Sequence, residues 1–190
     1  MTFRTSLTAL SLSLGLLVAG ATLTGCAHSS GTHDGMDSHG ATVAVAALQA
    51  KSGSSVHGWV RFEEVEGGVQ ITARIEGLKA NSKHAIHVHE LGDCSSSDGK
   101  SAGGHYNPEG HAHAGPDAAE SHAGDLGNLQ ADGSGMASYN RTFANLSVAG
   151  SNNPVIGHAI IIHAGEDDLK SQPTGNAGGR LACGTIGFAK

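Results

Sequence analysis

The feature that most constrains the fold is a series of short apolar runs that begins near residue 41. The runs occupy residues 41–49, 56–65, 68–78, 84–90, 135–143, 155–163 and 181–189. Several of them alternate apolar and polar residues with period two, and glycine-rich or polar turns separate them. A sustained 3.6-residue period is absent from the sequence. The pattern therefore predicts an all-β domain, either an antiparallel sandwich or a barrel.

Two stretches within this domain, residues 91–124 and 164–180, do not resemble strands. Loops of this length in compact domains are usually either functional or disordered. Cys94 lies at the start of the first stretch and Cys183 lies just after the second. We therefore expect both loops to be tied to the domain and to carry its function.

The N-terminal segment predicts export. Arg4 is followed by a long uncharged run, and the run ends in the sequence LTGC at Cys26. This resembles a lipoprotein signal peptide over residues 1–25, in which Cys26 is acylated and becomes the new N-terminus. An uncleaved helical anchor is the alternative, since about 20 residues can span a bilayer. Either way, we expect the domain at 41–190 to lie outside the cytoplasm.

Residues 26–40 are polar and rich in glycine and serine, which is typical of a flexible tether. A plain solvated linker is the preferred interpretation, and the alternative is that four of its side chains collect copper: His28, His33, Met36 and His39. If Cys26 carries lipid, Cys94 and Cys183 remain as one pair. Disulfides persist in export compartments, so we expect a bridge, with two free buried thiols as the alternative. The formal net charge of −6 gives no support to a nucleic-acid partner.

The histidines indicate metal binding. His87 and His89 are two residues apart on a predicted strand, so both side chains point to the same face and can reach one metal ion. His84 has the opposite parity, and we expect it to pack or form hydrogen bonds. His163 ends the apolar run AIIIH and could complete this site. Such an all-imidazole site suits copper, zinc, nickel or iron.

The first long loop adds a second cluster of metal-binding residues, His105, His111, His113, His122 and Asp125. Three histidines and one aspartate form a sound tetrahedral zinc site. Because one cluster lies on a strand and the other on a loop, the sequence predicts two metal ions rather than one.

Several longer motifs support a resemblance to a known family. These are HVHELGDC, GGHYNPEG, HAGPDAAESHAGDLGN, IIIHAGEDDL and GNAGGRLACGTIG, which lie between residues 84 and 187. Together they resemble the copper–zinc superoxide dismutases, in particular the secreted bacterial branch. The resemblance implies an eight-stranded Greek-key barrel with two long functional loops, and copper and zinc as cofactors.

The resemblance also implies a role for individual residues. Copper would be bound by His87, His89, His105 and His163, and zinc by His105, His113, His122 and Asp125. His105 would thus bridge the two ions, and Asp167 would link His87 to His113. Arg180 would lie over the copper channel and act with His105 in catalysis. Cys94 and Cys183 would form the family's disulfide.

The chain also departs from the family pattern. His111 is an additional histidine that could compete for metal, and we expect its side chain to be exposed. The segment between His163 and Arg180 is shorter than in the eukaryotic enzymes and contains only one lysine, Lys170. The expected guidance of the substrate by lysines is therefore missing from this segment.

The activity implied is dismutation of superoxide to oxygen and hydrogen peroxide, protecting the cell envelope from extracellular superoxide. A lipid anchor would hold the enzyme in the bacterial envelope. Two alternatives are a copper storage or delivery protein on the same fold and a zinc-stabilised binding module without catalysis. The resemblance leaves both a monomer and a homodimer open.

Overall fold

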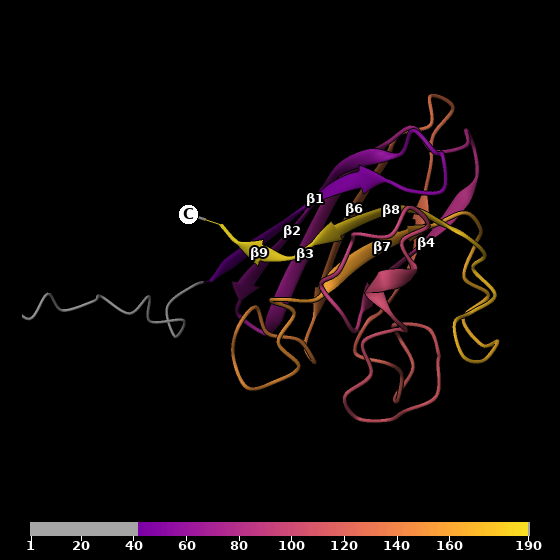
Figure 1. Ribbon diagram of the computed structural model, residues 1–190. Helices are drawn as coiled ribbons and strands as arrows, with labels where there is room; N and C mark the ends of the chain where they lie inside the picture. The colour runs from indigo at the N-terminus through magenta and orange to yellow at the C-terminus, as the bar shows by residue number, and fades with distance from the viewer. Residues whose placement is uncertain (1–41, 190) are drawn as a thin grey trace, which may run out of the picture. The chain divides into compact units, whose positions relative to one another are not determined.

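A computed structural model describes residues 42–189, so the predicted signal peptide, Cys26 and the tether lie outside the described residues. The strands are β1 (Val43–Ala50), β2 (His57–Val65), β3 (Gly68–Glu76), β4 (Lys83–His89), β5 (Asp125–Gln130), β6 (Ala137–Phe143), β7 (Ala159–His163), β8 (Arg180–Thr185) and β9 (Gly187–Phe188). One short 3-10 helix, η2 (Lys100–Ala102), lies in the first long loop. The predicted all-β fold is confirmed (Figure 1). Within residues 42–189, no helix is long and apolar enough to cross a membrane.

The strands form one antiparallel sheet in the order β5-β4-β7-β8-β1-β2-β3-β6, with the short β9 also paired to β1. The two ends of this order, β5 and β6, lie against each other, so the sheet curls into a nearly closed barrel. At this seam the Tyr139 hydroxyl of β6 donates a hydrogen bond of 2.7 Å to the Leu126 carbonyl of β5. Because β4 and β7 are not neighbours of the strands that precede them, the connections cross the barrel as in a Greek key.

The interior of the barrel is filled by every second residue of its strands. In β3, for example, Val69, Ile71 and Ile75 are fully buried while the residues between them are more exposed. This alternation follows from the period of two along a strand, and it explains why the sequence pattern predicted this part well. Phe62 of β2 is the largest fully buried side chain in this core.

Strands β4 and β7 are buried on both faces. Ile86, Val88, Ile160 and Ile162 point into the barrel core. On the outer face of β7, Ile161 packs in a second, smaller cluster beneath the first long loop, together with Ala102, Ala159 and Cys183. The outer face of β4 carries His87 and His89, which the two long loops cover. The two long loops therefore cover this outer face of the barrel.

The structure differs from the predicted strands in three places. The run predicted at 155–163 is a strand only over Ala159–His163, because a turn precedes it. Residues 125–130 form β5, which the sequence pattern did not predict, because the segment DLGNLQ contains residues with low strand propensity. Its Gly127 has a φ of +85°, and the β4–β5 ladder shifts register between Ala85 and His87. The last predicted run, 181–189, divides at the buried Ile186 into β8 and β9.

Candidate metal centre

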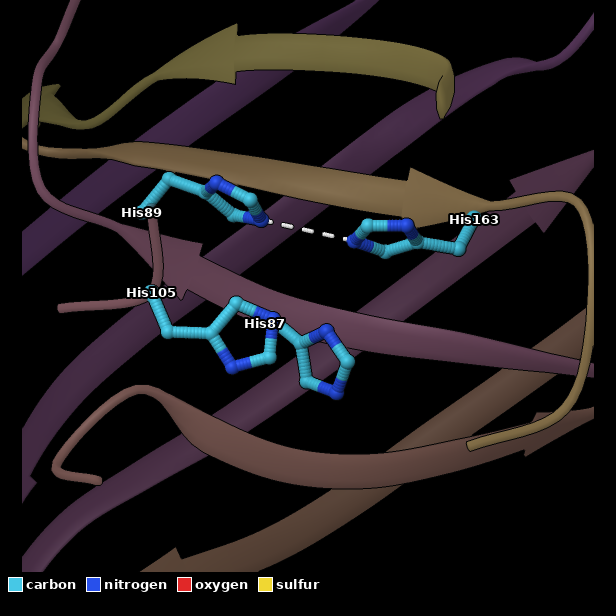
Figure 2. Close-up of side chains that lie close together, drawn as sticks. All are labelled: His87, His89, His105 and His163. Atoms are coloured by element: carbon cyan, nitrogen blue, oxygen red, sulfur yellow. Dashed lines mark hydrogen bonds between the residues drawn. The ribbon is translucent and has the colours of Figure 1, made fainter. Parts of the chain in front are cut away.

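Four histidines converge on the outer face of β4. His87 and His89 lie on β4, His163 ends the neighbouring β7, and His105 comes from the first long loop (Figure 2). The loop reaches this position because His105 forms an isolated antiparallel bridge with His89. All four residues are buried, and each offers a ring nitrogen within 4.8 Å of the others. The structure thus brings together the four residues predicted for copper.

Hydrogen bonds fix which nitrogen of each ring carries the proton. His89 Nδ1 lies 3.0 Å from the Gly103 carbonyl oxygen, and His163 Nδ1 lies 3.4 Å from that of Gly178. His87 Nε2 lies 2.9 Å from Asp167 Oδ2. Because these oxygens only accept hydrogen bonds, each of these nitrogens bears the hydrogen and the other ring nitrogen is left with a lone pair.

These lone pairs face one another. His89 Nε2 and His163 Nε2 are 3.3 Å apart, and Figure 2 shows the two rings pointing toward each other. Burial lowers the pKa of His87 to about 4, and it also lowers the pKa of His89 and His163 well below the ordinary value. The rings are therefore neutral at physiological pH and offer unprotonated nitrogens to a cation. An all-imidazole set of this kind fits copper.

The second cluster surrounds the carboxylate of Asp125, the first residue of β5. Its Oδ1 lies 2.8 Å from His105 Nδ1, 3.0 Å from His113 Nδ1 and 3.2 Å from His122 Nδ1. All four residues are buried, and their ligand atoms lie within 4.8 Å of one another. Three imidazoles and one carboxylate fit zinc.

Hydrogen bonds between the carboxylates and the imidazoles set the pKa values in this cluster. Burial lowers the pKa of His113, but hydrogen bonds to Asp125 and Asp167 outweigh this effect and raise it to about 9. Burial raises the pKa of Asp125, yet its hydrogen bonds with His105 and His113 hold it well below the usual range. Both shifts show that the carboxylates of this cluster favour a positive charge beside His113.

His105 belongs to both clusters. Its Nδ1 faces the Asp125 group, while its Nε2 is buried and has no hydrogen-bond partner. His87 Nδ1 is also buried without a partner. An unpaired buried polar atom costs free energy, so these two nitrogens require a partner that the described residues do not supply. A metal ion at the four-histidine cluster would satisfy both of them.

Asp167 connects the two clusters by binding one histidine of each. Its Oδ2 accepts a hydrogen bond from His87, and its Oδ1 lies 2.9 Å from His113 Nε2. Asn128 of β5 holds Asp167 in place, since its side chain bonds both the backbone N–H and the carbonyl oxygen of Asp167. The sequence-based prediction that Asp167 links His87 to His113 agrees with this geometry.

Two further residues support the second cluster and were missed from the sequence. Gln172 clamps the His113 backbone, accepting from its N–H at 2.8 Å and donating to its carbonyl at 2.7 Å. Gly175 has a φ of +67°, and a Cβ there would lie 1.8 Å from Asp167 Oδ1. The motif GNAGGR contains this glycine, but without the fold nothing in it points to Asp167.

Arg180, the first residue of β8, lies close to the four-histidine cluster. Its Nη1 donates to the Gly99 carbonyl at 2.8 Å and its Nη2 to the Gly103 carbonyl at 2.6 Å. The Gly103 carbonyl also accepts the hydrogen bond from His89. Among residues 42–189 the guanidinium forms no ion pair with a carboxylate, so its charge is free to attract an anion.

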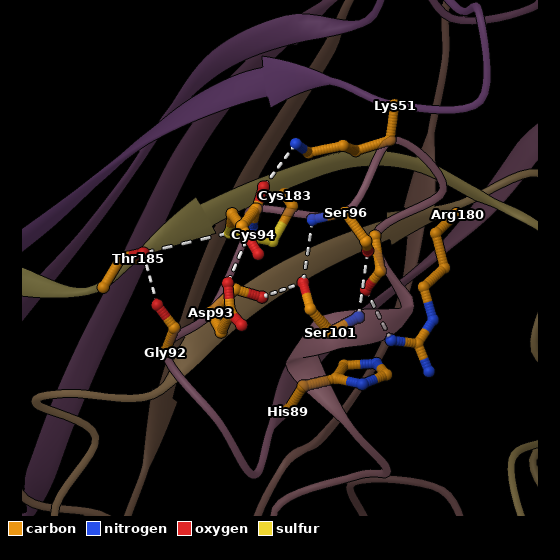
Figure 3. Close-up of a disulfide and its surroundings, with 12 residues drawn as sticks. Lys51, His89, Gly92, Asp93, Cys94, Ser96, Ser101, Arg180, Cys183 and Thr185 are labelled. Atoms are coloured by element: carbon orange, nitrogen blue, oxygen red, sulfur yellow. Dashed lines mark hydrogen bonds between the residues drawn. A yellow bond between two sulfur atoms is a disulfide. The ribbon is translucent and has the colours of Figure 1, made fainter.

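Cys94 and Cys183 form the predicted disulfide, with Cα atoms 5.7 Å apart (Figure 3). It joins the first long loop to β8, in the small apolar cluster beneath the loop. The bridge therefore fastens the loop that carries His105 close to Arg180.

The remaining predicted residues fall outside both clusters. His84 has a structural role, as expected, because its Nδ1 bonds the His163 carbonyl and its Nε2 the Ser82 hydroxyl. The expectation that His111 is exposed is wrong, since its side chain is only 33% exposed. Its Nδ1 lies 3.2 Å from the Ser121 carbonyl oxygen, which holds the ring against the loop. His28, His33, Met36 and His39 lie outside the described residues.

Comparisons with known proteins agree with this geometry. The family model described as "Copper/zinc superoxide dismutase (SODC)" matches residues 56–186. "Superoxide dismutase [Cu-Zn]" of Paramecium bursaria Chlorella virus 1 is 48% identical over 142 residues, covering 71% of this chain and 74% of the relative. The protein of the same name from Schizosaccharomyces pombe is 44% identical over 154 residues, covering 77% of this chain and 97% of the relative. "Superoxide dismutase [Cu-Zn] A" of Xenopus laevis is 43% identical over 140 residues, covering 70% of this chain and 90% of the relative. The chain therefore belongs to the copper/zinc superoxide dismutase family.

Proposed function

We propose that the two clusters hold the two metal ions of a superoxide dismutase, one ion in each cluster. Copper would be held by His87, His89, His105 and His163, and zinc by His105, His113, His122 and Asp125. The observation that carries this assignment is the pair of buried, partnerless nitrogens, His87 Nδ1 and His105 Nε2. Both nitrogens belong to residues of the all-imidazole cluster, where a bound metal ion would satisfy them.

A bound copper ion supplies one-electron chemistry by cycling between two oxidation states. The chain's own residues bind the substrate and handle protons. Arg180 attracts the superoxide anion and orients it, because its guanidinium carries no counter-ion among the described residues. A charge that is not neutralised near a reaction site raises the local concentration of an oppositely charged substrate.

His105 is the residue best suited to move a proton. Its Nε2 can take up a proton and pass it to a reduced substrate, while Nδ1 stays with the zinc cluster. Formation of hydrogen peroxide needs two protons for each pair of superoxide ions consumed. In this proposal one comes from His105 Nε2 and the other from water.

The metal assignment is tested by two ligand variants compared side by side. His163→Ala should lose copper and keep zinc, because His163 belongs only to the first cluster. His113→Ala should lose zinc preferentially, because it belongs only to the second. Metal content of both purified proteins, measured after loading with both ions, decides the assignment. Equal loss of both metals in both variants would contradict it.

For the whole chain we propose an exported lipoprotein of the bacterial secreted branch that protects the cell envelope from extracellular superoxide. Residues 1–25 would be a cleaved signal peptide, Cys26 the lipidated N-terminus and residues 26–40 the tether of the domain at 41–190. This rests on the LTGC sequence and on a disulfide, a bond that persists outside the cytoplasm. Incorporation of labelled fatty acid by the wild type but not by Cys26→Ser tests it, and equal incorporation would contradict it.

A further inference from the structure

Lys51 is a buried cation beside the disulfide. The residue directly follows β1 and is only 8% exposed. Its ammonium group donates a hydrogen bond to the Cys94 carbonyl oxygen (Figure 3). It forms no ion pair with a carboxylate among residues 42–189. Because burying an ammonium group is costly, a lysine in this position needs a reason beyond packing.

The loop that follows Cys94 runs between Lys51 and Arg180. A Cβ on Gly99 would lie 3.4 Å from Arg180 Cβ and 3.5 Å from Lys51 Cγ, so this glycine faces the space between the two side-chain stems. The Ser52 N–H also donates to the Ser97 carbonyl at 2.8 Å. The loop is thus held against the end of β1 at more than one point.

The same loop supplies both hydrogen-bond acceptors of Arg180. These are the carbonyl oxygens of Gly99 and Gly103, and the Gly103 oxygen is shared with His89 of the four-histidine cluster. The position of the guanidinium relative to that cluster therefore depends on the position of the loop backbone. The disulfide fixes the sulfur of Cys94, and two hydrogen bonds hold the peptide group that follows it. Lys51 binds its carbonyl oxygen, and Asp93 Oδ1 accepts from its Ser95 N–H at 2.7 Å. Lys51 is the one of these two partners that ties the loop to the end of β1.

We propose that Lys51 is a positioning residue for Arg180. By holding the Cys94 carbonyl, it fixes residues 94–103 so that the Gly99 and Gly103 carbonyls keep the guanidinium beside His89. This inference rests on the proposed role of Arg180 in binding the substrate anion.

The test compares three variants of the full chain loaded with both metals. Lys51→Met keeps the stem against Gly99 and removes the donor, Lys51→Arg keeps the donor, and Lys79→Met removes one charge from an exposed position between β3 and β4. The superoxide rate and the affinity for azide, an anion that binds near the copper, are measured at low and high ionic strength. Amide hydrogen exchange of residues 95–103 is followed in the metal-free proteins.

We expect Lys51→Met to lower both the rate and the azide affinity several-fold at both ionic strengths, at unchanged metal content, and to accelerate exchange in the loop. Lys51→Arg should restore most of the loss, and Lys79→Met should behave as wild type. Wild-type behaviour of Lys51→Met would overturn the inference. So would a loss that disappears at high ionic strength, because Lys51 would then act as a distant charge. Failure of Lys51→Arg to restore either property would also overturn it.

An Arg180→Glu variant measured alongside separates this inference from the proposed function. If Arg180→Glu keeps the wild-type rate and azide affinity, the proposed role of Arg180 fails and the inference falls with it. If Arg180→Glu loses both while Lys51→Met keeps both, the role of Arg180 stands and the inference about Lys51 alone is overturned.

Discussion

At the scale of single residues, one carboxylate sets the geometry of both ligand clusters. Asp167 accepts from His87 with one oxygen and from His113 with the other. Each bond fixes the tautomer of its ring, so that His87 presents Nδ1 to one cluster and His113 presents Nδ1 to the other. Partners of this kind orient metal ligands and raise their basicity.

Replacing Asp167 by asparagine should therefore weaken metal binding. An amide has one accepting oxygen, so its NH₂ group would face an N–H of one of the two histidines. We expect Asp167→Asn to lower zinc affinity about 10- to 100-fold, measured by competition with a chelator. Asp168→Asn is the matched control, because Asp168 accepts bonds only from Lys170 and Ser171. Wild-type zinc retention in Asp167→Asn would contradict the role of this carboxylate.

A second prediction at this scale concerns Arg180. Reversing its charge in Arg180→Glu should lower the rate of superoxide decay roughly tenfold or more, because electrostatic attraction raises on-rates by factors of about 10 to 1,000. The metal content should not change, since Arg180 is not a ligand. Arg74→Glu, an exposed charge reversal on β3, controls for net charge. An unchanged rate in Arg180→Glu would show that the guanidinium does not guide the substrate.

The residues of the two clusters and Asp167 were predictable from the sequence, whereas three other residues that hold this region in place were not. Spacing placed His87 and His89 on one face, and the family motifs named the rest. Asn128, Gln172 and Lys51 act through backbone atoms of residues 39 to 59 positions away in the chain. Such contacts depend on how the long loops fold over the barrel, and single residue types carry no signal of them.

At the scale of secondary-structure elements, the pattern of period two predicted best where one face of a strand meets solvent. β3 shows this alternation clearly. β5 was missed because it combines an acidic ligand, a glycine with positive φ and an asparagine that serves Asp167. The residues that β5 needs for the site thus stand where β-branched or aromatic residues would have indicated a strand.

The seam between β5 and β6 gives a prediction about barrel stability. Removing the Tyr139 hydroxyl in Tyr139→Phe breaks its bond to the Leu126 carbonyl, and a typical hydrogen bond contributes about 1 kcal/mol. We expect the free energy of unfolding to fall by about this amount in denaturant titrations, with metal content unchanged. No loss of stability would mean that the seam does not depend on this bond.

The same hydroxyl predicts a dependence on pH. Burial raises the pKa of Tyr139 above its usual value in the folded protein. Above pH ~10 the unfolded chain therefore binds fewer protons than the folded one, and stability falls as pH rises. Tyr139→Phe should show a smaller loss of stability between pH 9 and 11 than wild type. Parallel curves for the two proteins would contradict this assignment.

At the scale of the whole molecule, the disulfide fastens the first long loop to the barrel. Cys94 and Cys183 are 89 residues apart. Chain-entropy models assign about 4–5 kcal/mol to closing a loop of this size, and removing native disulfides typically costs about 2–5 kcal/mol. We expect reduction of the metal-free protein to lower its stability within this range. A change below about 1 kcal/mol would show that the loops are held by other contacts.

The chain as a whole is acidic, with a formal net charge of −6, and its substrate is an anion. Fast capture therefore requires positive potential close to the site rather than over the whole surface. Arg180, which forms no ion pair with a carboxylate among residues 42–189, lies beside the four-histidine cluster and is the cation that we expect to supply this potential.

The central claim is that the four-histidine cluster holds the copper that dismutates superoxide. The most direct test is decay of superoxide after pulse radiolysis, using protein with measured copper and zinc contents. We predict a rate close to the diffusion limit, about 10⁸–10⁹ M⁻¹s⁻¹, that rises in proportion to copper occupancy and disappears in His163→Ala. A negligible rate at full copper occupancy would contradict the claim and would favour copper storage or delivery on the same fold.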